Sequence, residues 1–219
     1  PEICFAGSLP SQQNALVSLD PNCPVANSIG GINAVNELGT WPEFHNGCAA
    51  GLKLGSGQAS ISRTWIVYNK PPEASYGHAG MLMALGLQGH LSVLSSTDVY
   101  RYLSQEHDAT TVGVLLGMAA ARKGSMDPTV SKMLFLHIPA RHPPSFPELE
   151  LSPHVQAAAL MSVGLLYLSS SHRFMTEILL AELGRGPCVD AALDREGYAL
   201  AAGLSLGFIT VGRGRDAED

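Results

Sequence analysis

Five apolar segments rich in glycine and alanine recur along the chain and can be superimposed. They are NGCAAGLKLG from Asn46, AGMLMALGLQG from Ala79, VGVLLGMAAARKG from Val112, AALMSVGLLYL from Ala158 and EGYALAAGLSLG from Glu196. The superposition aligns five anchor residues, Gly47, Gly80, Gly113, Ala158 and Gly197, which are 33, 33, 45 and 39 residues apart. A period of this size corresponds to one helix-turn-helix unit per repeat. The sequence therefore predicts an all-α helical-repeat solenoid over residues 44–214.

Small residues recur at fixed distances after each anchor. The fourth residue after the anchor is small in all five segments, and the sixth is small in all but one, where Lys53 stands. On an α-helix, residues four apart share a face and the sixth borders it, so each segment presents a surface almost without side chains. A glycine inside a helix costs about 1 kcal/mol relative to alanine. Close approach of a neighbouring backbone offsets that cost, so we expect five tightly stacked inner helices.

Amphipathic segments with larger side chains separate the small-residue segments. Their apolar residues follow the spacing i, i+3, i+4 of one helix face, in three groups: Val99, Tyr102 and Leu103; Val130, Met133 and Leu134; Met175, Ile178 and Leu179. We expect these to be outer helices that pack one face on the inner layer. Asp127 followed by Pro128 predicts a helix start, and Gly184 predicts a helix end.

Three stretches interrupt the regular pattern. Residues 1–43 contain scattered Gly, Pro and Asn, so we expect an irregular or extended lead-in, with a short strand at residues 15–19. The stretch 139–153 holds five prolines, which predicts an extended, non-helical surface insertion. That insertion is either a partner-binding loop or a plain connector. Residues 215–219 form an expected disordered tail, and we expect the whole chain to be a piece of a longer protein.

Charge and hydropathy argue against several classes of protein. The net charge is -6, and Lys and Arg are scattered singly, so the chain has no basic surface for a nucleic acid. The longest uncharged helical run, residues 197–212, falls short of the roughly 20 apolar residues that a membrane span needs. The four cysteines, Cys4, Cys23, Cys48 and Cys188, are far apart and form no C-x-x-C pair. We expect reduced intracellular thiols, with a disulfide or a reactive thiol as the alternative.

One catalytic motif occurs, but in the wrong context. Residues 203–207, GLSLG, match the G-x-S-x-G nucleophile elbow, which requires a strand before the serine and a helix after it. Here the same residues belong to the fifth predicted inner helix, so a serine hydrolase using Ser205 is only a remote alternative. Two histidine pairs, His78 with His90 and His137 with His142, lack the carboxylate or cysteine neighbours of a zinc site. We expect no catalytic, cofactor-binding or metal-binding residues, no cofactor, and no enzyme activity.

Several of these strings resemble a known repeat family. YGHAGMLMALGLQGHL and REGYALAAGLSLG are similar to the proteasome/cyclosome repeat, which builds a closed toroid of inner and outer helix pairs in two proteasome regulatory subunits and in a large cyclosome subunit. The intervening strings, among them WPEFHNGCAAGLKL, TWIVYNKPPE and LHIPARHPPSFPELEL, resemble the scaffold subunits of the anaphase-promoting complex almost continuously from Trp41 to Gly214. Residues 1–40 match chiefly through GSLPSQQNALVSLDPN.

The resemblance implies a non-catalytic scaffold segment of a multisubunit E3 ubiquitin ligase that controls mitotic progression and exit. It implies other subunits of that complex as partners, namely the cullin-like and RING module, the TPR subunits and the coactivator, and it implies neither nucleic acid nor membrane. It also implies a nuclear and cytoplasmic location. On this view the chain is an arc of the toroid. The alternative is a proteasome/cyclosome-repeat scaffold subunit of the proteasome regulatory particle.

Overall fold

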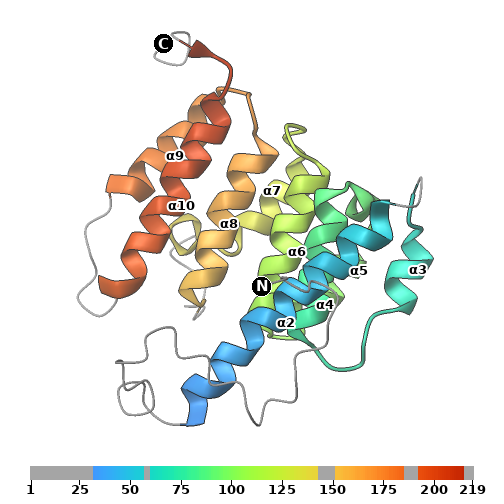
Figure 1. The fold of residues 1–219 in the computed structure, drawn as a ribbon. Coiled ribbons are helices and arrows are strands. Elements are labelled where there is room, and N and C mark those ends of the chain that lie inside the picture. The colour runs from blue at the N-terminus through green and yellow to red at the C-terminus, as the bar shows by residue number, and fades with distance from the viewer. Residues whose placement is uncertain (1–31, 57–59, 143–150, 185–191, 215–219) are drawn as a thin grey trace.

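Nine α-helices and two 3-10 turns make up the described part of the computed structural model (Figure 1), which covers residues 32–56, 60–142, 151–184 and 192–214. Side chains of residues 32–39, 55, 56 and 192–195 are outside the description. No strand occurs among the described residues. The expectation of an all-α helical-repeat fold is confirmed.

Five helices form an inner layer in which each helix packs against the next inner helix along the chain, as Figure 1 shows. They are α2 (Ile32–Ser56), α4 (Tyr76–Leu87), α6 (Asp108–Ala121), α8 (Pro153–Leu166) and α10 (Ala192–Thr210). Four shorter helices form an outer layer: α3 (Arg63–Tyr68), α5 (Ser96–Leu103), α7 (Pro128–Phe135) and α9 (Arg173–Gly184). Helix α5 packs on α6, α7 on α8 and α9 on α10, so each of these three outer helices covers an inner one.

The core lies between the two layers. Tyr102, Leu134 and Leu179 point inward from three outer helices and are almost completely buried, as the amphipathic spacing predicted. They pack with inner-layer leucines such as Leu115 and Leu160, which are also fully buried. Burying one such side chain contributes roughly 1.5 to 3 kcal/mol to folding. The repeats therefore share a single apolar core.

Polar caps set where the helices begin. The Ser62, Ser75 and Ser152 side chains each accept a hydrogen bond from a backbone N–H in the first turn of α3, α4 and α8. Asp127 caps α7 by accepting from the N–H groups of Thr129 and Val130, at 2.8 and 3.2 Å, with Pro128 as the first helical residue. Such caps satisfy backbone donors that have no partner within the helix. The helix start predicted at Asp127 is confirmed.

Glycines bring the inner helices into backbone contact. A Cβ atom added to Gly86 in α4 would lie 2.1 Å from the Cα of Gly117 in α6. One added to Gly164 in α8 would lie 2.6 Å from the Cα of Ser205 in α10. Real Cβ atoms do not come this close to backbone, so these helices could not approach as they do with any larger residue at either glycine. The close stacking expected from the small-residue pattern is confirmed for these helices.

The contacts assign a different register to the first and last repeats. Gly86, six residues after the anchor Gly80, meets Gly117, four residues after the anchor Gly113. Gly164 is six residues after the fourth anchor, Ala158, and it meets Ser205. By the same rule Ser205 is four residues after the fifth anchor, which is therefore Ala201. The sequence superposition, which placed it at Gly197, is therefore shifted by about one turn.

The first repeat is shifted in a similar way. Gly51 of α2 meets Ala84 of α4, with 2.8 Å between the added Cβ and that of Ala84. Since Ala84 is four residues after the anchor Gly80, Gly51 takes the position six residues after an anchor. The first anchor is therefore His45 and not Gly47.

Two expected irregular stretches contain helix. Helix α2 begins at Ile32, so residues 32–43 are helical and the expected irregular lead-in is wrong over that range. Pro42 lies inside α2, where its missing N–H leaves one helical hydrogen bond unmade. In the proline-rich stretch, Pro139–Arg141 form a 3-10 turn and Pro153 is the first residue of α8, so the expected extended insertion is wrong at both ends. Residues 1–31, 143–150 and 215–219, including the strand expected at 15–19, lie outside the described residues.

Candidate interaction surface

The loop after α6 caps the C-terminus of the next inner helix. The N–H groups of Gly124 and Met126 donate to the carbonyl oxygens of Leu165 and Leu166 in the last turn of α8, at 3.0 and 3.1 Å. Gly124 and Met126 both have left-handed backbone, with φ of 70° and 54°. A left-handed backbone turns two alternate N–H groups in one direction, and the last carbonyls of a helix have no partner within it. The loop therefore ties one repeat to the next.

The loop after α8 repeats this arrangement on α10. Ser169 and Ser171, with φ of 57° and 49°, donate from their N–H groups to Phe208 and Ile209 at 2.9 and 3.0 Å. Left-handed backbone is unfavourable for non-glycine residues and costs of order 1–3 kcal/mol. The two hydrogen bonds to otherwise unpaired carbonyls offset that cost. We call each such arrangement, two alternate left-handed residues whose N–H groups cap the next inner helix, a capping pair.

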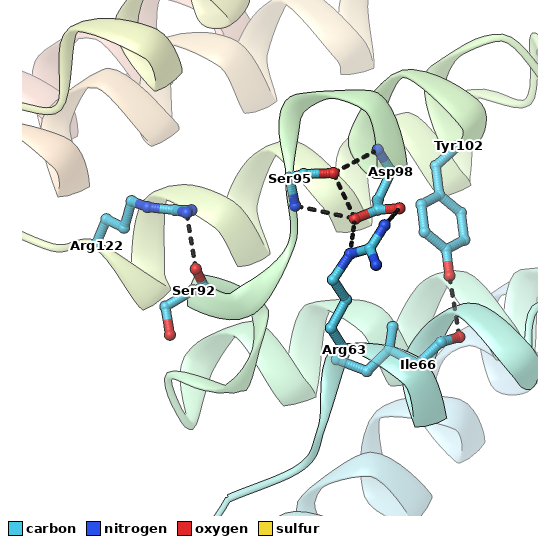
Figure 2. A network of polar contacts seen from close by, with 7 residues as sticks. All are labelled: Arg63, Ile66, Ser92, Ser95, Asp98, Tyr102 and Arg122. Atoms are coloured by element: carbon cyan, nitrogen blue, oxygen red, sulfur yellow. Dashed lines mark hydrogen bonds and ion pairs between the residues drawn. The ribbon is translucent and has the colours of Figure 1, made fainter.

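A third pair of left-handed residues follows α10. Gly212 and Gly214 have φ of 80° and 56°. Arg213 between them donates its guanidinium Nε and a terminal N–H to the Ser169 carbonyl, at 3.1 and 2.9 Å. Arg122 makes a similar link from the end of α6 to the Ser92 carbonyl at 2.9 Å, seen in Figure 2. These arginines anchor each loop to the loop of the repeat before it.

The face of α10 that points away from α8 is apolar and exposed. Leu200, Leu204 and Val211 are 63%, 47% and 48% exposed. A Cβ atom added to Gly207 would have nothing within 4 Å, although the equivalent Gly164 of α8 is packed against Ser205. Helix α10 thus carries the small-residue surface of an inner helix without a neighbour among the described residues. The first inner helix also exposes apolar groups, with Trp41 67% and Leu52 45% exposed.

An ion pair joins the outer helices α3 and α5 (Figure 2). The Arg63 guanidinium donates Nε and one terminal N–H to the two carboxylate oxygens of Asp98, at 2.6 and 2.7 Å. Asp98 is almost completely buried and also accepts from the Ser95 hydroxyl and N–H, at 2.6 and 3.0 Å. These donors, above all Arg63, hold the pKa of the Asp98 carboxyl well below its usual range. The pair positions outer helices and resembles no catalytic arrangement.

A half-buried histidine packs against Tyr102 of the same outer helix as Asp98. The His78 ring stacks on the ring of Tyr102, with 5.8 Å between centroids, and its Nε2 atom has no hydrogen-bond partner. Burial, and to a lesser extent the nearby charge of Lys70, lower the pKa of His78 to about 4. The Lys70 ammonium lies 4.9 Å from the Tyr102 ring centroid and donates to the Arg101 carbonyl. His78 is therefore a neutral packing residue at neutral pH.

Ser205 lies in the middle of α10 and is fully buried. Its hydroxyl oxygen lies 2.7 Å from the carbonyl oxygens of Leu160 and Ala201, and its single proton donates to these acceptors. A nucleophile elbow needs a strand before the serine and an accessible hydroxyl, and neither is present. The hydrolase alternative is therefore wrong, and Ser205 is a packing residue between α8 and α10.

The residues singled out for metal or thiol chemistry are dispersed. No group of three or more His, Cys, Asp or Glu side chains that could hold a metal ion occurs among the described residues. His90 accepts from the Ile61 N–H at 3.4 Å, and His137 and His142 bond to carbonyls of α7 and its C-cap. Cys48 is a free thiol, whereas Cys4, Cys23 and Cys188 lie outside the described residues. Within the described part, no helix has the length and hydropathy to cross a membrane.

The N-terminal end of the proline-rich stretch lies close to α9. The Arg141 guanidinium lies 5.3 Å from the centroid of the Phe174 ring. Phe174 itself is 48% exposed and lines an open recess with His172, Arg173 and Glu177. The recess contains no buried polar group aimed into it, so it has the character of a surface depression.

Sequence reasoning missed the residues that give this surface its shape. It assigned no role to Gly212 and Gly214, or to the equivalent capping-pair residues Met126 and Ser171. A glycine in the sequence often indicates left-handed backbone. Met126, Ser169 and Ser171 give no such indication, because non-glycine residues rarely adopt this conformation.

Two family models together match nearly the whole chain. Residues 1–123 match the model described as APC1 fourth domain, and residues 128–219 match the one described as APC1 fifth domain. The boundary between them falls in the loop between α6 and α7.

Curated relatives agree with these matches. The chain is 51% identical to anaphase-promoting complex subunit 1 of Arabidopsis thaliana over 217 residues, which is 99% of this chain and 12% of that protein. It is 45% identical to the human protein of the same name, over 88% of this chain and 10% of that one. It is 42% identical over 80% of its length to a protein of Emericella nidulans named negative regulator of mitosis, of which it covers 9%. The chain thus spans about a tenth of the length of these relatives, and none of these names refers to the proteasome.

Proposed function

The chain belongs to the family of anaphase-promoting complex subunit 1, and we propose from that premise that it forms a rigid, non-catalytic segment that holds other subunits of an anaphase-promoting complex in place. The observation that carries the proposal is the backbone contact between successive inner helices. Gly86 meets the backbone of Gly117, and Gly164 meets the backbone and the small side chain of Ser205. Such a stack deforms little, because any change of spacing between two inner helices breaks the close packing at their contact.

The proposed partners are the other subunits of the complex: the cullin-like and RING module, the TPR subunits and the coactivator. Ubiquitin transfer would then be carried out by the RING subunit, and this segment would contribute position only. Exposed aromatic residues on the outer layer, Tyr68 at 86% and Tyr100 at 70%, are of the type that anchors protein interfaces. A nuclear and cytoplasmic location is part of the same proposal.

The test uses the full-length protein, tagged and purified from dividing cells, with bound subunits quantified by mass spectrometry. The variant Gly86→Leu places a branched side chain where even a Cβ would lie 2.1 Å from α6. Gly197→Leu is the matched control, since it makes the same substitution in an inner helix where nothing lies within 4 Å. We expect Gly86→Leu to reduce recovery of the cullin-like and RING subunits several-fold and Gly197→Leu to leave it unchanged.

Protease sensitivity within this segment shows whether Gly86→Leu has disturbed the stack. If it has, and both variants still recover equal amounts of the cullin-like and RING subunits, the stack does not hold the subunits together. Recovery of proteasome ATPases in place of ligase subunits would assign the chain to the proteasome alternative.

A further inference from the structure

We propose that the outward faces of the outer helices α3 and α5 form a binding site for an acidic segment of another subunit. Lys70 and Arg101 would pair with the carboxylates of that segment, and the exposed rings of Tyr68 and Tyr100 would pack against its apolar side chains. The inference deepens the proposed scaffold function and rests on it for the kind of partner, a subunit of the same complex.

The inner faces of α3 and α5 hold the two helices side by side, as Figure 2 shows. Besides the ion pair described above, the Tyr102 hydroxyl of α5 donates to the Ile66 carbonyl of α3 at 3.5 Å, and both residues are buried. Tyr68 and Tyr100 each lie two residues from one of these buried residues, and two residues turn a helix by about 200°. Both tyrosines therefore point to solvent, where 86% and 70% of their surfaces are exposed.

Positive charge gathers where the C-terminal ends of these two helices meet. The Lys70 ammonium donates to the Arg101 carbonyl at 2.6 Å and lies over the Tyr102 ring. An ammonium group has three N–H donors, and no other hydrogen-bond acceptor for Lys70 occurs among the described residues. Burial and the charge of Arg101 both lower the pKa of Lys70. Lys70 is thus a partly buried cation beside a second cation.

No carboxylate of the described part of the chain pairs with either cation. The ion pairs found there are those of Arg63, Arg122 and Arg173. Asp98, the acidic residue of α5, is buried and already paired with Arg63. The whole chain carries a net charge of -6, so two neighbouring cations without a counter-charge stand out from the rest of the molecule. An acidic segment would supply the missing carboxylates, whereas a basic one would be repelled.

The two exposed tyrosines add an apolar requirement to this electrostatic one. Tyrosine and arginine are enriched at protein interfaces, where the ring of a tyrosine contributes apolar area and its hydroxyl group can bond to backbone. Tyr68 and Tyr100 border the two cations on α3 and α5. The occupant therefore carries at least one carboxylate that reaches Lys70 or Arg101, together with neighbouring apolar side chains that cover the rings.

Photo-crosslinking in the full-length protein, purified from dividing cells with its bound subunits, tests the occupant. A benzophenone amino acid replaces Tyr68, and the crosslinked peptides are identified by mass spectrometry. We expect a crosslink to a segment of another subunit in which Asp or Glu lies next to the crosslinked residue. Adding Arg101→Glu should reduce that crosslink several-fold, because attraction becomes repulsion. Lys132→Glu is the matched control, since it reverses an exposed cation on the outer helix α7 and should leave the crosslink unchanged.

A second charge reversal shows whether the pairing is direct. Replacing the acidic residues of the crosslinked segment by lysine should restore the crosslink to the Arg101→Glu protein. A crosslink to a segment without Asp or Glu, to the same polypeptide or to no protein would overturn the proposal, as would a crosslink that Arg101→Glu leaves unchanged.

Recovery of the cullin-like and RING subunits in the same samples reports on the proposed function separately. Full recovery of these subunits without an acidic crosslink would refute the binding site alone. An acidic crosslink to a proteasome subunit would refute the proposed function and leave the acidic binding site in place.

Discussion

Gly86 of α4 and Gly117 of α6 meet backbone to backbone, with the position of a Cβ on Gly86 only 2.1 Å from the Gly117 Cα. The contact explains why two helices accept glycine in their interiors, where alanine would otherwise be favoured by about 1 kcal/mol. The same relationship recurs between Gly164 and Ser205, so it is a property of the repeat and not of one junction.

Replacing Gly86 by alanine should destabilise the chain. The added methyl group collides with backbone that cannot rotate away, so α4 and α6 must separate, at a cost of about 1–3 kcal/mol. Gly197→Ala, the control, adds the same methyl group where nothing lies within 4 Å and should be neutral or stabilising. Urea unfolding followed by circular dichroism measures both. An unchanged midpoint for Gly86→Ala would contradict the backbone contact.

Asp98→Asn should also destabilise the chain, by about 1–3 kcal/mol at pH 7, because it removes the charge that several hydrogen bonds to a buried carboxylate depend on. The Asp98 pKa is lower in the folded chain than in the unfolded one. Its contribution to stability is therefore complete above the unfolded pKa, near 4, and is lost as the pH falls below it. The difference between wild type and Asp98→Asn in unfolding free energy should accordingly shrink below about pH 4.

The exposed pair of Arg173 and Glu177 supplies the control for Asp98. Their side chains are 91% and 59% exposed, and such pairs contribute little. Glu177→Gln should change the unfolding free energy by less than about 0.5 kcal/mol. If it destabilised the chain as much as Asp98→Asn, the buried ion pair would have no special role.

Stability should also fall between pH 6.5 and about pH 4 because of His78. Its folded pKa is about 4, below the ordinary value of 6.5, so in this window the unfolded chain takes up a proton that the folded chain does not. Each pH unit then costs up to about 1.4 kcal/mol. His78→Phe keeps a ring against Tyr102 and removes the titration, so its unfolding midpoint should depend less on pH over this range. An identical pH dependence in both proteins would assign the effect to other groups.

Ser205 should behave as a packing residue. Ser205→Ala removes the hydrogen bond to the Leu160 carbonyl and should cost about 0.5–1.5 kcal/mol, the usual net contribution of one hydrogen bond. A fluorophosphonate probe, which labels activated serines, should leave the wild-type protein unlabelled at this position. Stoichiometric labelling of Ser205 would restore the hydrolase alternative.

The sequence predicted those features whose physical cause lies within a single helix, such as its small or apolar face. Small residues after Gly80 and Gly113 predicted the close packing of α4, α6 and their neighbours, and the apolar spacing around Tyr102 and Leu134 predicted the outer helices. The predicted register was wrong in α10 because the run YALAAGLSLG contains so many small residues that several superpositions fit, and only contacts such as Gly164 with Ser205 distinguish them.

Other features depend on the neighbouring repeat and have no local signal. Met126 and Ser171 adopt left-handed backbone because carbonyls of the next inner helix accept their N–H groups, which a single-sequence pattern does not reveal. Scattered Gly, Pro and Asn indicated an irregular lead-in over residues 1–43, yet α2 runs through Pro42 because packing on α4 outweighs one missing hydrogen bond.

The most direct test of the stacked inner layer is disulfide trapping between α8 and α10. Gly164→Cys with Ser205→Cys brings together two Cβ atoms that the structure places 2.8 Å apart. A disulfide needs about 3.5–4.5 Å between these atoms, so α8 and α10 must separate slightly at this point, after which mild oxidation should join the pair. Gly164→Cys with Leu204→Cys is the matched control, since the Leu204 side chain is 47% exposed on the opposite face. A crosslink is expected between positions 164 and 205 and none between 164 and 204. Equal crosslinking of both pairs, or crosslinking of the control alone, would contradict it.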